Sequence, residues 1–303
     1  MKNHIRSIIL PIAMLLAVLL HRYCGAVYFL APYLVFTMLF MAYTAIDVKK
    51  MRISRLIVCL IVAQTILTVG FFGILKLIGL SEVICDSVLV CCLTPVAASV
   101  VVVSCALGAS RETVTAFTII DNLYIAILAP ALFSLIGTGQ QELTYFQSFW
   151  KILCRISPQI VFPFFAAMFT QFCMPRLNAA IVKIKGYSLY VWAMTLTIIL
   201  GKTYDDVITA PDPQWELVAI ITIISAVLCA ILFSVGKHLG ERHGEKIAGG
   251  QVLGQKNTSF GIWMAIEYLS PMSAVAPALY SVWQNFFNSY QMYVHDKNHE
   301  PET

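Results

Sequence analysis

The chain has 303 residues, of which 59% are apolar and only 12% are charged, and its mean hydropathy is +0.80. Soluble domains carry about 25% charged residues, so this composition excludes a soluble globular protein. Apolar blocks recur along the whole chain, and each is long enough to cross the roughly 30 Å hydrocarbon core of a bilayer. They predict an all-α polytopic membrane protein. The net charge of +4 does not indicate a nucleic-acid partner, because the basic residues lie between the apolar blocks.

The apolar blocks predict ten transmembrane helices in two sets of five. The first set occupies residues 1–137, with spans expected at 5–20, 26–46, 56–77, 84–107 and 113–137. A connecting loop, 138–148, leads to the second set at 149–294, with spans expected at 150–173, 187–201, 215–235, 247–268 and 272–293. Segment 202–214, which contains Asp205 and Asp206, is expected to be a polar loop, and residues 295–303 a polar cytoplasmic tail.

Lysine and arginine residues are distributed unevenly among the segments that join the spans. If the N-terminus is inside, most of them fall on the inside, including the basic segment 47–55. Positive residues are retained on the cytoplasmic side of membrane proteins. We therefore expect both termini to be cytoplasmic and the protein to lie in the inner cell membrane. The choice between a monomer and a homo-oligomer stays open.

The nine cysteines and six histidines show no spacing typical of metal ligands. Several cysteines fall inside predicted spans without a CxxC pair, which indicates small packing residues. The histidines fall at span ends, in loops or in the tails. No metal site is expected.

A seven-residue segment occurs once in each half of the chain. Residues 129–135 read Ala-Pro-Ala-Leu-Phe-Ser-Leu, and residues 276–282 read Ala-Pro-Ala-Leu-Tyr-Ser-Val. Each copy follows a span that contains helix-breaking residues, Pro95 in the first half and the glycines of 249–254 in the second. Five spans per half give the two halves opposite topology. Inverted repeats with paired broken helices are typical of secondary transporters.

The segment 249–259 reads Gly-Gly-Gln-Val-Leu-Gly-Gln-Lys-Asn-Thr-Ser and lies inside a predicted span. Irregular backbone at membrane depth is tolerated only where protein or a water-filled cavity covers it. An ionisable residue such as Lys256 at that depth indicates a functional site. The alternative is a kinked structural helix whose lysine reaches the membrane interface.

Three local patterns resemble the bile acid:sodium symporter family, within the bile/arsenite/riboflavin transporter superfamily. They are Cys91-Cys92 followed by Pro95, the run Gly254-Gln255-Lys256-Asn257-Thr258-Ser259, and the run from Pro277 to Asn285. The resemblance implies a panel domain of spans 1, 2, 6 and 7 and a core domain of spans 3–5 and 8–10. It also implies that the broken helices 4 and 9 cross in the core, and that small organic anions move by alternating access, usually with sodium.

The chain departs from that family at the positions of the sodium ligands. The family's glutamate and glutamine in span nine correspond here to Val252 and Lys256, and its Ser-Asn pair in span four falls near Val100 and Val101. Valine offers no oxygen ligand, and an ammonium repels a cation. No cofactor is therefore expected: sodium is possible in the family, but its ligands are replaced in this chain.

We expect Lys256 to be a built-in cation that replaces sodium, held by Asp121, Thr118 and Gln64. A buried ammonium needs a paired carboxylate, and Asp121 lies one helical turn beyond Thr118. Alternatively, Lys256 binds the carboxylate of the substrate directly. The other candidate binding residues are polar side chains beside Lys256 and in the last span: Gln255, Asn257, Thr258, Ser259, Gln284 and Asn285.

The sequence thus predicts a secondary transporter for a small organic anion, a carboxylate or a sulfate, without classical sodium coupling. Its expected partners are that anion and the lipid bilayer. One alternative is a degenerate family member with a structural or sensing role. The other is an integral-membrane enzyme, but no HExxH, GxSxG or clustered Asp or His is present, so an enzyme is not expected.

Overall fold

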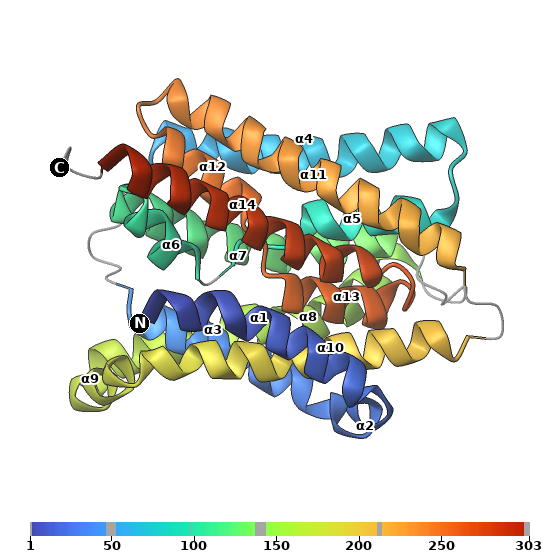
Figure 1. The fold of residues 1–303 in the computed structure, drawn as a ribbon, viewed down its shortest axis with the longest axis horizontal. Coiled ribbons are helices and arrows are strands. Elements are labelled where there is room, and N and C mark those ends of the chain that lie inside the picture. The colour runs from blue at the N-terminus through green and yellow to red at the C-terminus, as the bar shows by residue number, and fades with distance from the viewer. Residues whose placement is uncertain (1, 47–52, 98, 137–143, 211–213, 300–303) are drawn as a thin grey trace. The chain divides into compact units, whose positions relative to one another are not determined.

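The structure is a computed structural model that describes residues 2–46, 53–97, 99–136, 144–210 and 214–299. Within these ranges the regular structure is helical (Figure 1), apart from one isolated antiparallel bridge between Val96 and Lys256. The predicted all-α fold class is confirmed. The chain divides into two compact units that interleave along the sequence.

Unit 1 comprises Met1–Asp47, Ile120–Gln214 and Ile262–Ala274. Its helices are α1 (Lys2–Leu19), α2 (His21–Val27), α3 (Ala31–Thr44), α8 (Tyr145–Cys173), α9 (Pro175–Lys183) and α10 (Ser188–Ile208), with the C-terminal parts of α7 (Arg111–Ile136) and α13 (Thr258–Tyr268). Helix α10 packs against α1, α2 and α3, and α3 packs against α8. Helix α8 begins with a capping box in which Thr144 and Gln147 satisfy each other's backbone N–H groups.

The expectation of a polar loop from residue 202 is wrong, because α10 continues to Ile208. Lys202 forms an ion pair with Asp206 one helical turn later, a spacing that stabilises a helix. Asp205 accepts a 2.6 Å hydrogen bond from His21 Nδ1 on α2. Local pairing and a partner from a distant segment therefore keep this charged stretch helical.

Unit 2 comprises Val48–Ile119, Trp215–Gly261 and Val275–Thr303. Its helices are α4 (Arg55–Ile78), α5 (Glu82–Leu93), α6 (Val100–Ala106), α11 (Trp215–Glu241), α12 (Lys246–Gly254) and α14 (Val275–His299), with the N-terminal parts of α7 and α13. Helix α11 runs beside α12 and α14, and α4 packs against α5 (Figure 1). Helix α14 extends through His299, into part of the segment predicted to be a tail.

Helices α11 and α12 approach each other closely at small residues. A Cβ atom on Gly236 would collide with the backbone of Gly249, and a Cβ atom on Gly249 would collide with that of Gly236 and Gly240. Gly236 and Gly240 are four residues apart and lie on one face of α11. This is the small-residue spacing that lets helices in membranes pack backbone to backbone.

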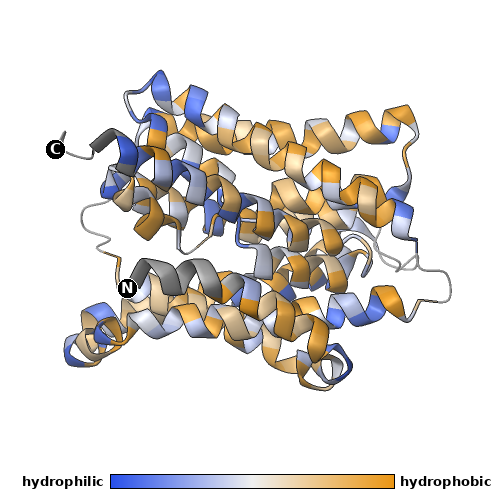
Figure 2. Cartoon of the chain, viewed as in Figure 1, coloured by the Kyte–Doolittle hydropathy of each residue, from blue (hydrophilic) through white to orange (hydrophobic). Residues whose placement is uncertain are grey.

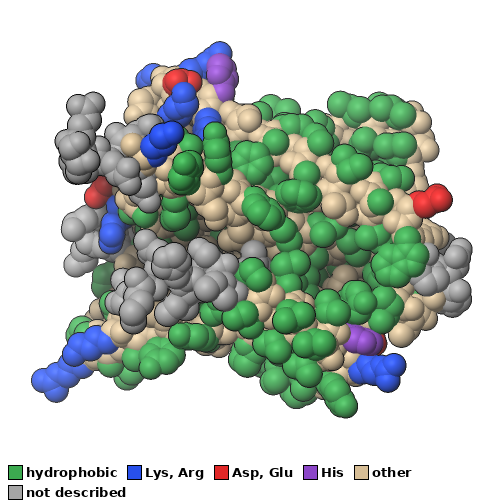
Figure 3. Space-filling view, viewed as in Figure 1, with side chains coloured by type: hydrophobic (Ala, Val, Ile, Leu, Met, Phe, Trp, Pro, Cys, Tyr) green, Lys and Arg blue, Asp and Glu red, His purple; other side chains and the backbone are tan. Residues whose placement is uncertain are grey.

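Five helical segments of the described residues are long and apolar enough to cross a membrane: His21–Thr44, Arg55–Ile78, Arg111–Ile136, Tyr145–Cys173 and Trp215–Glu241. A sixth is obtained if the bent pair of α9 and α10 is one span. Apolar residues dominate these helices (Figure 2), and hydrophobic side chains cover much of the face shown in Figure 3. The chain is a multi-pass integral membrane protein. The predicted count of ten spans and the two repeats at 1–137 and 149–294 stay predictions.

Candidate functional site

Two helix interruptions in unit 2 are joined by backbone hydrogen bonds. The first lies between α5 and α6 and contains Pro95, and the second lies between α12 and α13 and contains Lys256. Proline disfavours helical geometry in the residue before it, and Thr94 is extended there, with φ −54° and ψ 130°. Val96 pairs with Lys256 in the antiparallel bridge.

Two further bonds flank this bridge. Ala97 N donates to Gln255 O at 3.0 Å, and Asn257 N donates to Pro95 O at 2.7 Å. Each interruption therefore satisfies backbone groups that the other leaves without helical partners, which explains how irregular backbone is tolerated inside the unit.

Lys256 is buried, with only 1% of its surface exposed. Its ammonium Nζ donates to the carbonyl oxygen of Cys92 at 3.3 Å, in the last turn of α5. Its backbone is held by Gln284 of α14: Lys256 N donates to Gln284 Oε1 at 2.8 Å, and Gln284 Nε2 donates to Lys256 O at 3.2 Å. The structure thus brings together two residues predicted for the site, Lys256 and Gln284.

A network of side-chain amides lies beside this interruption, between α12 and α14. Gln251 Nε2 donates to Asn288 Oδ1 at 3.2 Å and to Gln291 Oε1 at 3.3 Å. Gln255 Nε2 donates to Gln251 Oε1 and, at 3.2 Å, to Asn288 Oδ1. Sequence reasoning found Gln255 but missed Gln251, Asn288 and Gln291. Gln284, Asn288 and Gln291 follow one another at intervals of about one helical turn. This spacing could have indicated a polar stripe on α14.

The end of α12 is also tied to α14 by an aromatic side chain. Tyr280 OH donates to the carbonyl oxygen of Gly254 at 2.7 Å, one of the terminal carbonyls that a helix leaves without an internal partner. Trp283 Nε1 donates to Ser225 Oγ of α11 at 3.1 Å. The first bond ties the end of α12 to α14, and the second ties α14 to α11.

Several predicted binding residues are buried with polar atoms that have no hydrogen-bond partner among the described residues. They are Gln64 Nε2 and Oε1, Asn257 Nδ2, Thr258 Oγ1 and Ser259 Oγ. A buried polar atom without a partner costs about 1–3 kcal/mol. Such atoms therefore favour a site that receives polar ligand atoms or water.

The remaining predicted residues lie on α14 and α7. Asn285 donates to Ser281 O of its own helix at 2.6 Å, so its amide is used locally. Thr118 is buried in the unit 2 part of α7 and donates to Val114 O at 2.7 Å. Asp121 is also fully buried in α7 but belongs to unit 1. The ion pair expected between Asp121 and Lys256 stays a prediction.

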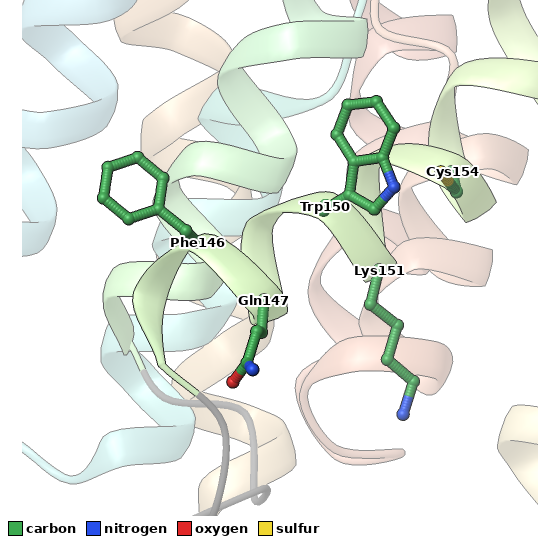
Figure 4. Close-up of a pocket in the computed structure, with 5 residues that line it drawn as sticks. All are labelled: Phe146, Gln147, Trp150, Lys151 and Cys154. Atoms are coloured by element: carbon green, nitrogen blue, oxygen red, sulfur yellow. The ribbon is translucent and has the colours of Figure 1, made fainter.

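Unit 1 carries a surface groove of about 600 Å³ along α8, lined by Phe146, Gln147, Trp150, Lys151 and Cys154. Figure 4 shows Gln147 and Lys151 pointing to one side of the helix, and Phe146 and Trp150 to the other. Exposed aromatic rings beside a lysine are typical of the membrane–water interface. We therefore interpret this groove as part of the lipid-contacting surface.

Comparisons of the chain with known protein families and with curated proteins found no match.

Proposed function

We propose that the protein is a secondary transporter that moves a small organic anion across the inner membrane by alternating access. Lys256 acts as a fixed cation in place of a bound sodium ion. The transported anion is a carboxylate or a sulfate, and transport proceeds by facilitated diffusion, exchange or proton coupling.

The observation that carries this proposal is a buried lysine at the point where two interrupted helices are hydrogen-bonded. Lys256 is 1% exposed, and its ammonium contacts a carbonyl oxygen of α5 at 3.3 Å. Helix C-termini carry partial negative charge, which favours an ammonium over a neutral group. An ammonium held in this way offers an anion a strong interaction in a medium of low dielectric constant.

The buried polar atoms around the interruption support the same function. Asn257, Thr258 and Ser259 follow Lys256 directly, and each has a side-chain atom without a partner among the described residues. Thr258 and Ser259 begin α13, and the partial positive charge at the N-terminus of a helix favours an anion. These groups together suit the oxygen atoms of a carboxylate or sulfate.

The ten-helix arrangement with two inverted repeats belongs to the same proposal. Unit 2 contains both helix interruptions, while α1, α2, α3, α8, α9 and α10 belong to unit 1. This division is consistent with one domain that carries the site and a second, separate domain. Alternating access needs two such bodies.

The test is uptake of radiolabelled organic anions by proteoliposomes, with sodium present or replaced by choline. The panel contains bile acids, a pantothenate-like acid and a sulfated steroid, and protein-free liposomes serve as the control. We expect at least one anion to accumulate at equal rates with sodium and with choline. Strict sodium dependence would contradict the role of Lys256, and absence of uptake across a broad panel of anions would contradict the transporter itself.

A further inference from the structure

Unit 1 holds a second polar cluster, separate from Lys256, to which the proposed function assigns no role. It consists of Tyr28 of the 3-10 turn Tyr28–Leu30, Arg155 and Gln159 of α8, and Glu267 and Tyr268 at the end of α13. We refer to these five residues as the α8–α13 cluster. All of them lie in unit 1.

The ion pair between Arg155 and Glu267 connects α8 to α13 within the α8–α13 cluster. The Arg155 side chain is 59% exposed and that of Glu267 is 19% exposed. Because much of the Arg155 side chain is exposed beyond this pair, its guanidinium is accessible to an incoming ligand. A guanidinium carries five N–H donors in a planar fork that matches a carboxylate, and an incoming carboxylate can therefore replace Glu267.

Three buried polar atoms of the α8–α13 cluster have no hydrogen-bond partner among the described residues: Tyr28 OH, Tyr268 OH and Gln159 Oε1. The Tyr268 ring is held by Phe133, stacked at 5.4 Å between ring centroids, and by Trp263, edge-on at 6.1 Å. Its hydroxyl is therefore held in one direction. Since unpaired buried groups destabilise a protein, a ligand that pairs with these atoms gains affinity.

The charged and hydroxyl groups of the α8–α13 cluster lie near one another. The charges of Glu267 and Arg155 act on the hydroxyls of both Tyr28 and Tyr268, and that of Asp206, which is paired with Lys202, also acts on Tyr28. Gln159 follows Arg155 by four residues and lies on the same face of α8. The cluster therefore offers three donors, Arg155 and the two tyrosine hydroxyls, and a free acceptor, Gln159 Oε1.

This arrangement selects a class of ligand. A guanidinium and two hydroxyl donors favour an anion over a cation. Three donors suit the two oxygens of a carboxylate, and the acceptor suits a hydroxyl group on the same molecule.

We propose that the α8–α13 cluster is a binding site for a small hydroxylated carboxylate. The carboxylate replaces Glu267 on Arg155 and accepts hydrogen bonds from Tyr28 and Tyr268, and a hydroxyl group of the ligand donates to Gln159. The inference rests on the proposed function only in taking an organic anion as the ligand, and it gives that anion a second site outside unit 2.

The first test is calorimetric titration of the full-length protein in detergent with gluconate, hexanoate and sorbitol. Gluconate has the carboxylate and the hydroxyls, hexanoate lacks the hydroxyls, and sorbitol lacks the charge. We expect gluconate to bind, hexanoate to bind at least about tenfold more weakly, and sorbitol not to bind. Hexanoate and sorbitol each lack groups that gluconate uses for hydrogen bonds to buried atoms. Equal binding of gluconate and sorbitol, or no binding of gluconate, overturns the proposal.

The second test uses substitutions that change one group at a time. Arg155→Gln is expected to weaken gluconate binding at least about tenfold, and Glu267→Gln to strengthen it, because the competing carboxylate is removed. Arg176→Gln, at an exposed arginine of α9, is the matched control and leaves the affinity unchanged. If Arg155→Gln and Arg176→Gln bind gluconate alike, the site is not at Arg155.

Removal of the tyrosine hydroxyls distinguishes a ligand-binding site from a cluster with a purely structural role. Tyr28→Phe and Tyr268→Phe keep the rings and remove an atom that has no partner among the described residues. We therefore expect the thermal stability to be unchanged and gluconate binding to weaken. Tyr190→Phe, at an exposed tyrosine of α10, is the control. Unchanged gluconate affinity in both cluster variants means that the hydroxyls bind only water, and it overturns the proposal.

Failure of this inference differs from failure of the proposed function. If gluconate binds through Arg155 but no anion enters proteoliposomes, the binding site at the α8–α13 cluster is supported and the transport function is contradicted. If anions are taken up but no cluster substitution changes gluconate binding, the transport function is supported and the binding site at the α8–α13 cluster is contradicted.

Discussion

The ammonium of Lys256 donates a hydrogen bond to the carbonyl oxygen of Cys92, 3.3 Å away. Lys256 lies in the interruption between α12 and α13, and its side chain thus caps the C-terminus of α5. Cys92 lies in the last turn of α5, where carbonyls lack partners within the helix and carry partial negative charge. This contact explains in part how a lysine is held inside unit 2.

Replacement of Lys256 by methionine keeps the length and apolar stem of the side chain and removes its charge. We expect Lys256→Met to lower anion uptake by about tenfold or more, because a hydrogen bond to a charged group contributes about 1.5–3 kcal/mol and 1.4 kcal/mol is a factor of ten. Uptake by proteoliposomes, normalised to the amount of folded protein, measures the effect. Lys183→Met, at an exposed lysine of α9, is the control, and equal uptake by both variants would exclude Lys256 from the site.

Gln284 holds the backbone of Lys256 through two hydrogen bonds, at 2.8 and 3.2 Å. Gln284→Ala leaves a buried N–H and a buried C=O without this partner, so we expect the free energy of unfolding to fall by roughly 2 kcal/mol. Denaturation of the protein in detergent measures it. Asn285→Ala, in the next residue, removes a bond to its own helix and is expected to change stability by less than about 0.5 kcal/mol. A loss in Asn285→Ala as large as that in Gln284→Ala would contradict the assigned role.

Gly249 allows α11 and α12 to touch, since a Cβ atom there would collide with the backbone of Gly236 and Gly240. Backbone cannot move aside as a flexible side chain can, so Gly249→Ala is expected to lower stability by about 1–3 kcal/mol. Gly73→Ala, inside α4, meets nothing within 4 Å and is expected to raise stability by up to about 1 kcal/mol through helix propensity. Thermal melting of the two alanine variants against the parent shows whether their effects have opposite signs.

The ion pair that the sequence predicts between Asp121 and Lys256 can be tested by a double-mutant cycle. If it exists, Asp121→Asn or Lys256→Gln alone leaves one buried charge without its partner and costs about 3–5 kcal/mol. The double variant then loses less than the sum of the two, with a coupling of at least about 1 kcal/mol. Additive losses in unfolding free energy would mean that the two side chains do not interact.

Hydropathy along the chain was sufficient to predict the helical membrane class, because burial in lipid needs long apolar helices whose backbone is satisfied internally. Pro95 and Gly254 also indicated where helices are interrupted, because proline and glycine disfavour a continuing helix, whereas Gly249 and Gly250 lie inside α12. The prediction of a loop from residue 202 was wrong because contacts within the folded chain, and not local preference, decide the structure there. The charges of this segment lie in a helix in which Lys202 pairs with Asp206 and His21, distant in the sequence, binds Asp205.

Tertiary packing decided what no local pattern contains. Gln251 and Asn288 meet only because α12 and α14 lie together, and Tyr28, Arg155 and Glu267 come from three distant segments. The sequence by itself determined which residues are too polar for lipid. Only the folded chain decides which of them become neighbours, because side-chain partners are selected by helix packing and not by separation along the chain.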